Sequence, residues 1–274
     1  MMDEKRGRVF SFGGGVQSHA VMVLQAQGKL ERPYDAFIFA NVGADSENPA
    51  TLEYIERYTK PFAEEHNITL LEVRKQGRTL REQVVRSNLR SVVIPAYKGD
   101  GGSVHRNCTS DWKIEQVDRA IRAIKATHCE VGLGISQDEA HRARGEEWHD
   151  RVVSKSGLTV KMLGFWKKRE YPLLEQRINR AQCNTLILSA GLPQPPKSSC
   201  YFCPFKKPSE WIEMKQNNPD LFAKAVELER AINNKGLSGD PYHLHAFKKP
   251  LEQAVSDQLI FDDLMNCDTG YCHT

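Results

Sequence analysis

A run of three glycines stands near the start of the chain, between an apolar run typical of a strand and an amphipathic stretch typical of a helix. The segment reads Ser11-Phe12-Gly13-Gly14-Gly15-Val16-Gln17-Ser18. Glycines let the backbone approach a ligand closely, and the amides at the start of a helix favour an anion. The junction is a candidate phosphate cradle, with a plain tight turn as the alternative. It is not a Walker A loop, because no Lys precedes Ser18, and Ser18 replaces the third glycine of a Rossmann fingerprint.

Cysteines form the second group of residues that could do chemistry. Cys200 and Cys203 make a C-x-x-C followed by Pro204, and Cys183 lies 17 positions upstream of Cys200. A redox pair, a zinc site and an iron–sulfur cluster are the three readings. The redox pair fits least well, because the motif lies in a late Pro-rich loop and not at the start of a βαβ unit. Closed tetrahedral ligation needs a fourth donor.

Hydrophobic patterning predicts the elements that position these groups. Strands are expected over 8–12, 35–43, 69–73 and 129–135, and helices over 16–27, 49–67, 79–87, 114–125 and 220–233. Strands that alternate with helices are typical of βαβ units and a parallel sheet. The alternation fades from about Gly157. We therefore expect an α/β nucleotide-binding domain over 1–156 and a mostly helical, Cys-bearing region over 157–274.

Composition excludes several classes of protein. Of 274 residues, 40% are hydrophobic and 27% are charged, which excludes disorder, collagen and coiled coil. No run approaches the roughly 18 to 20 apolar residues of a membrane span, and the first residues carry no apolar secretion signal, so a cytoplasmic location without a membrane partner is expected. Seven cysteines are few for a chain of this length, so disulfides are not needed. A net charge of +3 identifies no nucleic-acid binder.

The glycine loop resembles the pyrophosphatase loop (PP-loop) of the N-type ATP pyrophosphatase superfamily, and specifically of its phosphoadenosine phosphosulfate reductase-like branch, whose pattern is Ser-Gly-Gly-x-Asp-Ser. Gly14, Gly15 and Ser18 match, whereas Gly13 and Gln17 replace Ser and Asp. Three further segments of that branch recur in the same order along residues 8–215: Asn41-Val42-Gly43-Ala44-Asp45 with Pro49, Arg106-Asn107-Cys108-Thr109 with Lys113, and Gly134-Ile135-Ser136 with Asp138, Glu139 and Arg142.

The resemblance implies a Rossmann-like open parallel sheet of the adenine nucleotide α-hydrolase type, which binds ATP at the strand carboxyl ends. Such enzymes typically attack the α-phosphate with a substrate oxygen and release pyrophosphate, with Mg²⁺ and basic side chains neutralising the phosphates. The catalytic candidates are then Ser18, Arg106, Lys113 and Arg142. The nucleotide-binding candidates are Ser11, Phe12, Gly13, Gly14, Gly15, Gln17, Ser18, Asn41, Gly43 and Asp138.

Each of these charged residues also has an ordinary structural reading. Arg106, Lys113 and Arg142 could form solvated salt bridges. Asp138 and Glu139 could hold Mg²⁺ or orient Arg142, but acidic residues in a first turn also cap helices.

The resemblance also bears on the cysteines. Cys108 is the preferred fourth ligand beside Cys183, Cys200 and Cys203, because its segment matches one that carries a Cys in related proteins; Cys267 and Cys272 are the rivals. Related sulfur-handling members carry a [4Fe-4S] cluster, and Zn²⁺ is the alternative. Cys129 stands in an expected buried strand and is assigned to the core.

Basic pairs recur beside aromatic residues. They are Lys167-Lys168-Arg169 next to Phe165-Trp166, Lys206-Lys207 next to Phe205, and Lys248-Lys249 near Phe247. Such groups could grip a nucleic-acid backbone and stack bases. Because the pairs are scattered and the net charge is low, a solvated face is favoured. His243 and His245 are expected to be surface or structural residues.

We therefore expect an ATP pyrophosphatase that adenylates a substrate oxygen, in sulfur transfer or nucleic-acid modification, as in the DNA phosphorothioation ATP pyrophosphatases of this branch. The nucleotide is its small-molecule partner, and a nucleic acid or a sulfur-donor protein is a candidate second one. A sulfonucleotide reductase that forms sulfite is the alternative enzyme, although its Glu-Cys-Gly-Leu-His motif is absent around Cys272-His273. A nucleotide- or nucleic-acid-binding module with a structural zinc is the third hypothesis. No oligomeric state is predicted.

Overall fold

The computed structural model describes residues 5–86, 91–99, 106–145, 147–153, 160–237 and 239–255. The chain divides into two compact units. Unit 1 comprises Met1–Gln76 and Asp111–Ser199, and unit 2 comprises Gly77–Ser110 and Cys200–Thr274. These units differ from the expected ranges 1–156 and 157–274, because each combines two stretches of chain and unit 1 continues to Ser199.

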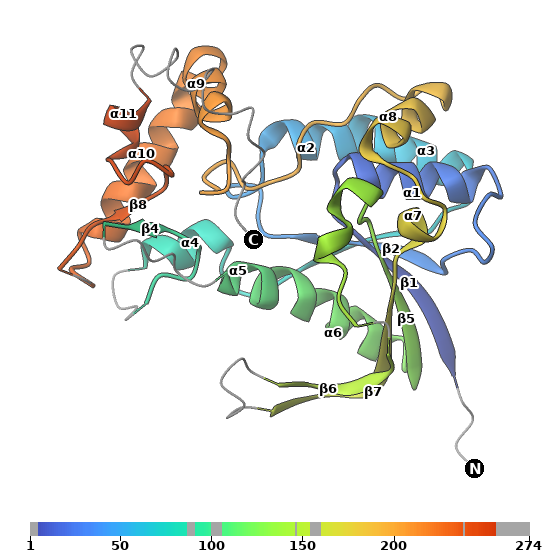
Figure 1. Cartoon of the computed structure of the whole chain (residues 1–274). Helices are drawn as coiled ribbons and strands as arrows, with labels where there is room; N and C mark the ends of the chain where they lie inside the picture. The colour runs from blue at the N-terminus through green and yellow to red at the C-terminus, as the bar shows by residue number, and fades with distance from the viewer. Residues whose placement is uncertain are drawn as a thin grey trace. The chain divides into compact units, whose positions relative to one another are not determined.

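Unit 1 is built on a six-stranded sheet with the order β3-β2-β1-β5-β7-β6 (Figure 1). Its strands are β1 (Arg6–Phe12), β2 (Ala36–Asn41), β3 (Leu70–Arg74), β5 (His128–Leu133), β6 (His149–Val153) and β7 (Val160–Glu170). All neighbours pair in parallel except β6, which is antiparallel to β7. The chain turns from β1 to β2 on one side and returns to β5 on the other, which makes a crevice at the carboxyl ends of β1 and β5. The predicted Rossmann-like α/β fold class is confirmed.

Helices cover both faces of this sheet (Figure 1). On one face, α1 (Val16–Ala26), α3 (Lys60–Glu65) and α8 (Arg180–Ser189) pack on Phe10, Phe12 and Phe37. On the other face, Val117 and Ile121 of α6 (Glu115–Ala123) pack on Val9, Ile38 and Val131. All six residues of β2 are buried, as expected for a central parallel strand. The remaining helical segments are α2 (Pro49–Tyr54), the π-helical turns η1 (Ile55–Thr59) and η2 (Ser110–Ile114), the 3₁₀ segment η3 (Gln137–Arg142), and α7 (Pro172–Glu175).

Four strands and the long helices fall where the sequence predicts them, but β7 does not. The region from Gly157 was expected to be mostly helical, whereas Val160–Glu170 is a strand of 11 residues. Its charged run Lys167-Lys168-Arg169 hides the alternation typical of a strand. Lys167 is buried, with its Nζ 2.5 Å from Asp118 Oδ1, so this lysine occupies a core position that a hydrophobic pattern does not reveal.

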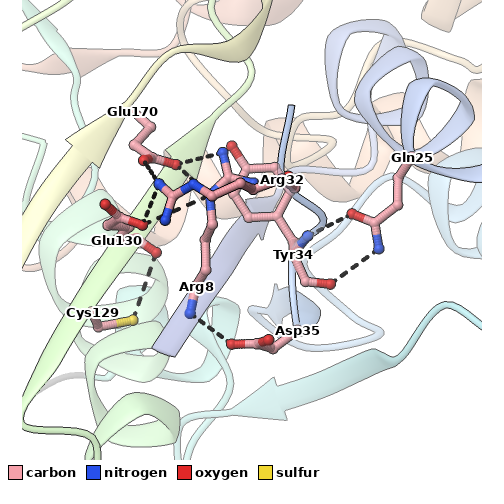
Figure 2. Close-up of polar contacts among 8 residues, drawn as sticks. All are labelled: Arg8, Gln25, Arg32, Tyr34, Asp35, Cys129, Glu130 and Glu170. Carbon is pink, nitrogen blue, oxygen red and sulfur yellow. Dashed lines mark hydrogen bonds and ion pairs between the residues drawn. The ribbon is translucent and has the colours of Figure 1, made fainter. Parts of the chain in front are cut away.

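A buried ionic cluster crosses β1, β5 and β7 (Figure 2). Arg8 Nε donates to Glu170 Oε2 at 2.8 Å, and Arg32 Nη2 lies 2.7 Å from Glu130 Oε2 and 3.2 Å from Glu170 Oε1. Burial raises the pKa of Glu170 against the opposing effect of Arg8. The Arg8 guanidinium carbon lies 4.1 Å from the centre of the Tyr34 ring. The cluster ties the Arg32–Tyr34 loop to three strands.

Unit 2 is mainly helical. Its elements are α4 (Leu80–Val85), β4 (Tyr97–Lys98), α5 (Asn107–Thr109), α9 (Pro208–Asn217), α10 (Pro219–Asn233), β8 (Tyr242–His243) and α11 (Leu251–Ala254). β4 and β8 pair in antiparallel fashion, and α10 contacts α4, α9 and α11. This unit contains the C-x-x-C segment. Within the described ranges of the whole chain, every helix is too short or too polar to cross a membrane.

Candidate nucleotide site

The glycine loop follows β1 at the crevice of the sheet. Gly14 has φ +74°, and a Cβ on it would lie 3.1 Å from Thr51 Cγ2. Gly15 is the N-cap residue of α1, and a Cβ there would lie 3.1 Å from Ser198 Oγ. Side chains at these positions would strain the backbone or displace their neighbours. Glycine thus suits the close approach of α2 and of the segment before Cys200, and at Gly14 it also suits the positive φ.

Ser18 stabilises the loop from within the first turn of α1. Its hydroxyl accepts a hydrogen bond from Gly15 N at 3.2 Å and lies 3.1 Å from Gly15 O. The first turn of α1 contains no acidic residue. The amide end of the helix therefore keeps its positive potential, which is the condition for binding an anion.

His19 anchors the same turn, although the sequence analysis did not select it. Its Nδ1 lies 2.9 Å from the Gly15 carbonyl oxygen, and its Nε2 lies 2.7 Å from Thr59 Oγ1. Since a carbonyl only accepts, Nδ1 carries the proton and Nε2 accepts from the Thr59 hydroxyl. Burial lowers the pKa of His19 to about 4, so the ring is neutral near pH 7. A histidine one position after Ser18 on a buried helix face was the available signal.

The loop after β2 is held by Asn41. Its Oδ1 accepts a hydrogen bond from Gly43 N at 2.8 Å, and its Nδ2 donates to Glu72 Oε1 at 2.9 Å. Gly43 has φ +123°, which a residue with a side chain rarely adopts. Both polar atoms of the buried Asn41 side chain thus hold the turn that leads to Glu47.

Glu47 is the main residue of this region that the sequence analysis missed. It is 1% exposed, and its Oε1 lies 3.5 Å from Lys113 Nζ. That oxygen and the buried Thr51 Oγ1 make no hydrogen bond within the described structure. Buried polar atoms without partners are costly and mark functional positions or a missing ligand. An acidic residue just after the second strand, at the carboxyl edge of the sheet, could have indicated it.

The segment that precedes the C-x-x-C packs against the glycine loop inside unit 1. Tyr54 Oη donates to Pro193 O at 2.5 Å, Asn48 N donates to Ser199 O at 3.1 Å, and Ser198 contacts Gly15. The β2 loop, α2 and this segment therefore enclose the loop from one side. Ser199 directly precedes Cys200 in the chain.

The loop after β5 closes on α1. A Cβ on Gly134 would lie 3.3 Å from Ser18 N, so glycine allows this approach. Gln17 Nε2 donates to Glu139 Oε2 at 3.4 Å, and Arg142 Nη1 lies 2.6 Å from the same oxygen. Arg142 is more than half exposed, so this pair is a weak surface interaction.

Asp138 contacts the start of α8. Its Oδ2 accepts a hydrogen bond from Arg180 N, in the first turn of α8, at 2.5 Å. A carboxylate at a helix start is stabilised by the amide end of the helix.

The predicted site residues are divided between the units. Unit 1 contains the candidates Ser11, Phe12, Gly13, Gly14, Gly15, Gln17, Ser18, Asn41, Gly43, Lys113, Asp138 and Arg142, and unit 2 contains Arg106. The Arg106 guanidinium carbon lies 5.3 Å from the centre of the Phe205 ring. This contact brings the loop before Cys108 next to the segment after Cys203, inside unit 2.

The cysteines differ in their surroundings. Cys183 is fully buried in the apolar core beside α1, and burial raises its thiol pKa to about 11. Cys108, Cys200 and Cys203 are partly exposed in unit 2. In the described part of the chain, no three or more His, Cys, Asp or Glu side chains are arranged to hold a metal ion. Cys267 and Cys272 lie outside the described residues. Cys129 is buried, which confirms its assignment to the core.

Comparisons with known proteins add a distant structural likeness. No family profile and no curated protein matches the chain. A solved structure that resembles it is the U34-tRNA thiolase NcsA from Methanococcus maripaludis with its [4Fe-4S] cluster, at 16% identity and a TM-score of 0.42, covering 85% of this chain and 74% of that one. A likeness at this level is too distant to assign an activity, which must be argued from the site.

Proposed function

We propose that this chain is an ATP pyrophosphatase that transfers the AMP part of ATP to an oxygen of an acceptor, in sulfur transfer or nucleic-acid modification. The observation that carries the proposal is the cradle after β1. There Gly14 and Gly15 have close neighbours, Ser18 fastens the turn, and α1 begins without an acidic residue. Such a cradle suits a polyphosphate at the crevice of an open α/β sheet.

The chain's own residues supply the binding groups. Backbone amides of the glycine loop and of the start of α1, other than the Gly15 amide that donates to Ser18, would hold the phosphates, and Asn41 and Gly43 shape the neighbouring loop. Lys113 supplies a positive charge beside Glu47. The buried Oε1 of Glu47 makes no hydrogen bond in the described structure and suits Mg²⁺, since this ion takes one or two carboxylates together with substrate phosphates. Bound Mg²⁺ would neutralise the charge on the phosphates.

The reaction is a displacement at the α-phosphorus. The acceptor oxygen forms a bond to this phosphorus, and the bond to the oxygen that bridges the α- and β-phosphates breaks. Pyrophosphate leaves with that electron pair, and the proton of the acceptor passes to water. The positive charge of Lys113 would stabilise the charge that develops on the leaving group, and Ser18 keeps the loop fixed.

For the metal centre we propose Cys108, Cys200 and Cys203 as ligands, supported by the Arg106–Phe205 contact between their two segments. Cys183 is left out of this set, because its thiol is enclosed by apolar side chains with a raised pKa. Cys267 and Cys272 are the candidates for a fourth donor. A [4Fe-4S] cluster would supply an iron site for sulfur, whereas Zn²⁺ would cross-link the loops.

Metal analysis of anaerobically purified protein tests this centre. Iron with labile sulfide supports sulfur chemistry, and stoichiometric zinc makes the centre structural. Cys200→Ser should lose the bound metal, whereas Cys183→Ala should keep it and only unfold more easily, since it leaves a core cavity. Loss of the metal from Cys183→Ala together with its retention in Cys200→Ser would contradict the ligand set.

Product analysis tests the activity. The protein is incubated with ATP and Mg²⁺ and with bulk RNA or denatured DNA as a pool of acceptors, and pyrophosphate is measured by a coupled assay. Acceptor-dependent pyrophosphate supports the proposal. ADP and phosphate would refute it, and sulfite formed from an adenylylated sulfate would favour a sulfonucleotide reductase.

A further inference from the structure

An aromatic cluster lies on the sheet face at β5 and β7, away from the glycine loop. We call His128, Trp148 and Trp166 the aromatic platform. The rings of His128 and Trp166 are nearly parallel, with an interplanar angle of 11° and centres 6.3 Å apart. Trp148 meets His128 edge-on at 5.3 Å. Trp148 is 37% exposed and Trp166 is 42% exposed, which is unusual for such large apolar groups.

Strand register places basic residues beside the platform. Arg6, His128 and Trp166 stand in one row across β1, β5 and β7, and Arg8, Glu130 and Lys168 stand in the next row. Residues that are paired in register share a face of the sheet. On β6, Arg151 pairs with Met162 of β7. Met162 lies four residues before Trp166, so both side chains, and that of Arg151, are on the same face of the sheet.

The opposite face of β7 holds the rest of the aromatic and basic motif. Phe165 is 4% exposed, and Lys167 is buried against Asp118. The structure thus divides the predicted motif: Phe165 and Lys167 belong to the core, whereas Trp166 and Lys168 lie on the other face. Figure 1 shows the β6–β7 hairpin below α6, and Lys161 of β7 forms an ion pair with Glu115 of α6.

Acidic groups near the platform are largely compensated. Glu130 and Glu170 are paired with Arg8 and Arg32 (Figure 2), and Asp150 is paired with Arg151 at 2.9 Å. A cavity of about 390 Å³ adjoins Lys168 and contains Arg8 and Arg32 together with the carboxylates of Glu31, Glu170 and Glu175. The cavity is of mixed charge and Asp150 offsets Arg151, so Arg6 and Lys168, in the two rows described above, are the main basic groups beside the platform.

We propose that the aromatic platform, with Arg6, Lys168 and Arg151, is a docking site for single-stranded nucleic acid. Exposed indole rings stack on unpaired bases, and flanking basic groups track the phosphates. A duplex hides the faces of its bases, so it matches the platform poorly. The site rests on the proposed function and specifies it: the acceptor, or the strand that carries it, is a single-stranded segment.

The platform is distinct from the place of reaction. Arg6 and His128 begin β1 and β5, whereas the glycine loop follows the last residue of β1. With a rise of about 3.3 Å per residue, the seven residues of β1 separate the two places by roughly 20 Å. A single-stranded nucleic acid bound at the platform therefore has to extend over several nucleotides to reach the proposed ATP site.

Fluorescence anisotropy with labelled oligothymidylate and oligouridylate tests the site on the full chain. Trp166→Ala and Trp148→Ala should each weaken binding by about fivefold or more, since stacking of this kind is worth that much per base. Lys168→Gln should reduce the salt dependence of binding. Phe247→Ala is the matched control, because Phe247 is an equally exposed aromatic residue (40%) in unit 2, and it should bind as the unaltered protein does.

Tryptophan fluorescence gives a second readout. The other two tryptophans, Trp112 and Trp211, are buried, so quenching by an oligonucleotide reports stacking on Trp148 and Trp166. Unchanged affinity in both Trp variants, or tighter binding of a duplex than of a single strand, would overturn the site. A platform that instead joins two copies, seen as a dimer that Trp166→Ala dissociates without any oligonucleotide binding, would also overturn it.

The two proposals fail separately. Pyrophosphate release without oligonucleotide binding overturns the docking site and leaves the ATP pyrophosphatase intact. Oligonucleotide binding that depends on Trp166, in a protein that releases no pyrophosphate, supports the docking site and contradicts the proposed activity. A preference for RNA or for DNA, with either result supporting the site, identifies the source of the strand.

Discussion

The carboxylate of Glu47 lies 3.5 Å from the ammonium group of Lys113, and its Oε1 is buried without a hydrogen bond in the described structure. Glu47 is almost fully buried, whereas the Lys113 side chain is about one-third exposed. A buried carboxylate whose ion-pair partner lies 3.5 Å away, and whose Oε1 makes no hydrogen bond, is incompletely compensated. This arrangement is explained if a cation completes the surroundings of Glu47 when nucleotide binds.

Glu47→Gln is expected to lower the rate of pyrophosphate release by about tenfold or more and to raise the Mg²⁺ concentration needed for half-maximal rate, because an amide is a weaker Mg²⁺ ligand than a carboxylate. A steady-state titration with Mg²⁺ measures both effects. Glu56→Gln is the control, since Glu56 forms an exposed pair with Lys60 and should have no effect. An unchanged Mg²⁺ dependence in Glu47→Gln would exclude the carboxylate as a ligand.

Gly14→Ala should weaken ATP binding by about tenfold or more, measured by isothermal titration calorimetry, because the new Cβ would press on Thr51 and distort the cradle. Gly28→Ala is closely matched. Gly28 also has a positive φ, +64°, but no atom lies within 4 Å of its Cβ position. Both variants should lose about 1 kcal/mol of stability, and only Gly14→Ala should lose ATP. Equal affinities of the two variants for ATP would show that the glycine loop does not bind the nucleotide.

The sequence predicts the sheet well because a parallel strand buried on both faces leaves a plain apolar run, as in Ala36–Asn41. It predicts β7 poorly, since Lys167 is buried through its pairing with Asp118, a partner 49 residues away. Glu47 was missed for the same reason. Its importance lies in its burial against Lys113, which depends on the packing of the β2 loop on the turn before α6. Cys183 is the opposite case. Its spacing from Cys200 suggested a metal ligand, but its side chain is buried in the apolar core.

Arg8 and Arg32 of the ionic cluster in Figure 2 should contribute differently to the free energy of unfolding. Arg8→Met should lower the free energy of unfolding by about 3 kcal/mol, since it leaves the buried Glu170 with weaker compensation. Arg32→Met should lower it by less than about 1 kcal/mol, because the Arg32 side chain is 56% exposed. Urea unfolding measures both. A larger loss in Arg32→Met than in Arg8→Met would contradict this ranking.

The buried carboxyl of Glu229 makes stability depend on pH. Burial raises its pKa to about 7, although the backbone amides of Leu251 and Leu244 act in the opposite direction. The fold therefore prefers the protonated carboxyl. Its contribution is complete below the unfolded pKa of about 4.5 and is lost as pH rises through about 7, by roughly 3 kcal/mol in total. Glu229→Gln should flatten the decline in unfolding free energy between about pH 5 and pH 8.

Two buried histidines near Glu229 make stability depend on pH at acid pH. Burial lowers the pKa of His245 to about 4 and also lowers the pKa of His243, whose Nδ1 lies 3.3 Å from Glu229 Oε1. The contribution of His245 is complete above pH 6.5 and is lost as pH falls through about 4, and the lowered pKa of His243 acts in the same direction. The unfolding free energy of the Glu229→Gln variant, measured with urea over a pH series, should therefore still fall toward acid pH but should no longer decline between about pH 5 and pH 8. If the decline between about pH 5 and pH 8 remains in this variant, groups other than Glu229 cause it.

If the glycine loop positions ATP for adenylyl transfer, cleavage falls between the α- and β-phosphates. The most direct measurement follows ATP labelled at the α-phosphorus, incubated with Mg²⁺ and single-stranded acceptor and separated by thin-layer chromatography. We expect label in an adenylylated acceptor or in AMP, together with unlabelled pyrophosphate, and we expect Gly14→Ala to form neither the labelled product nor pyrophosphate. Label recovered as ADP would contradict it.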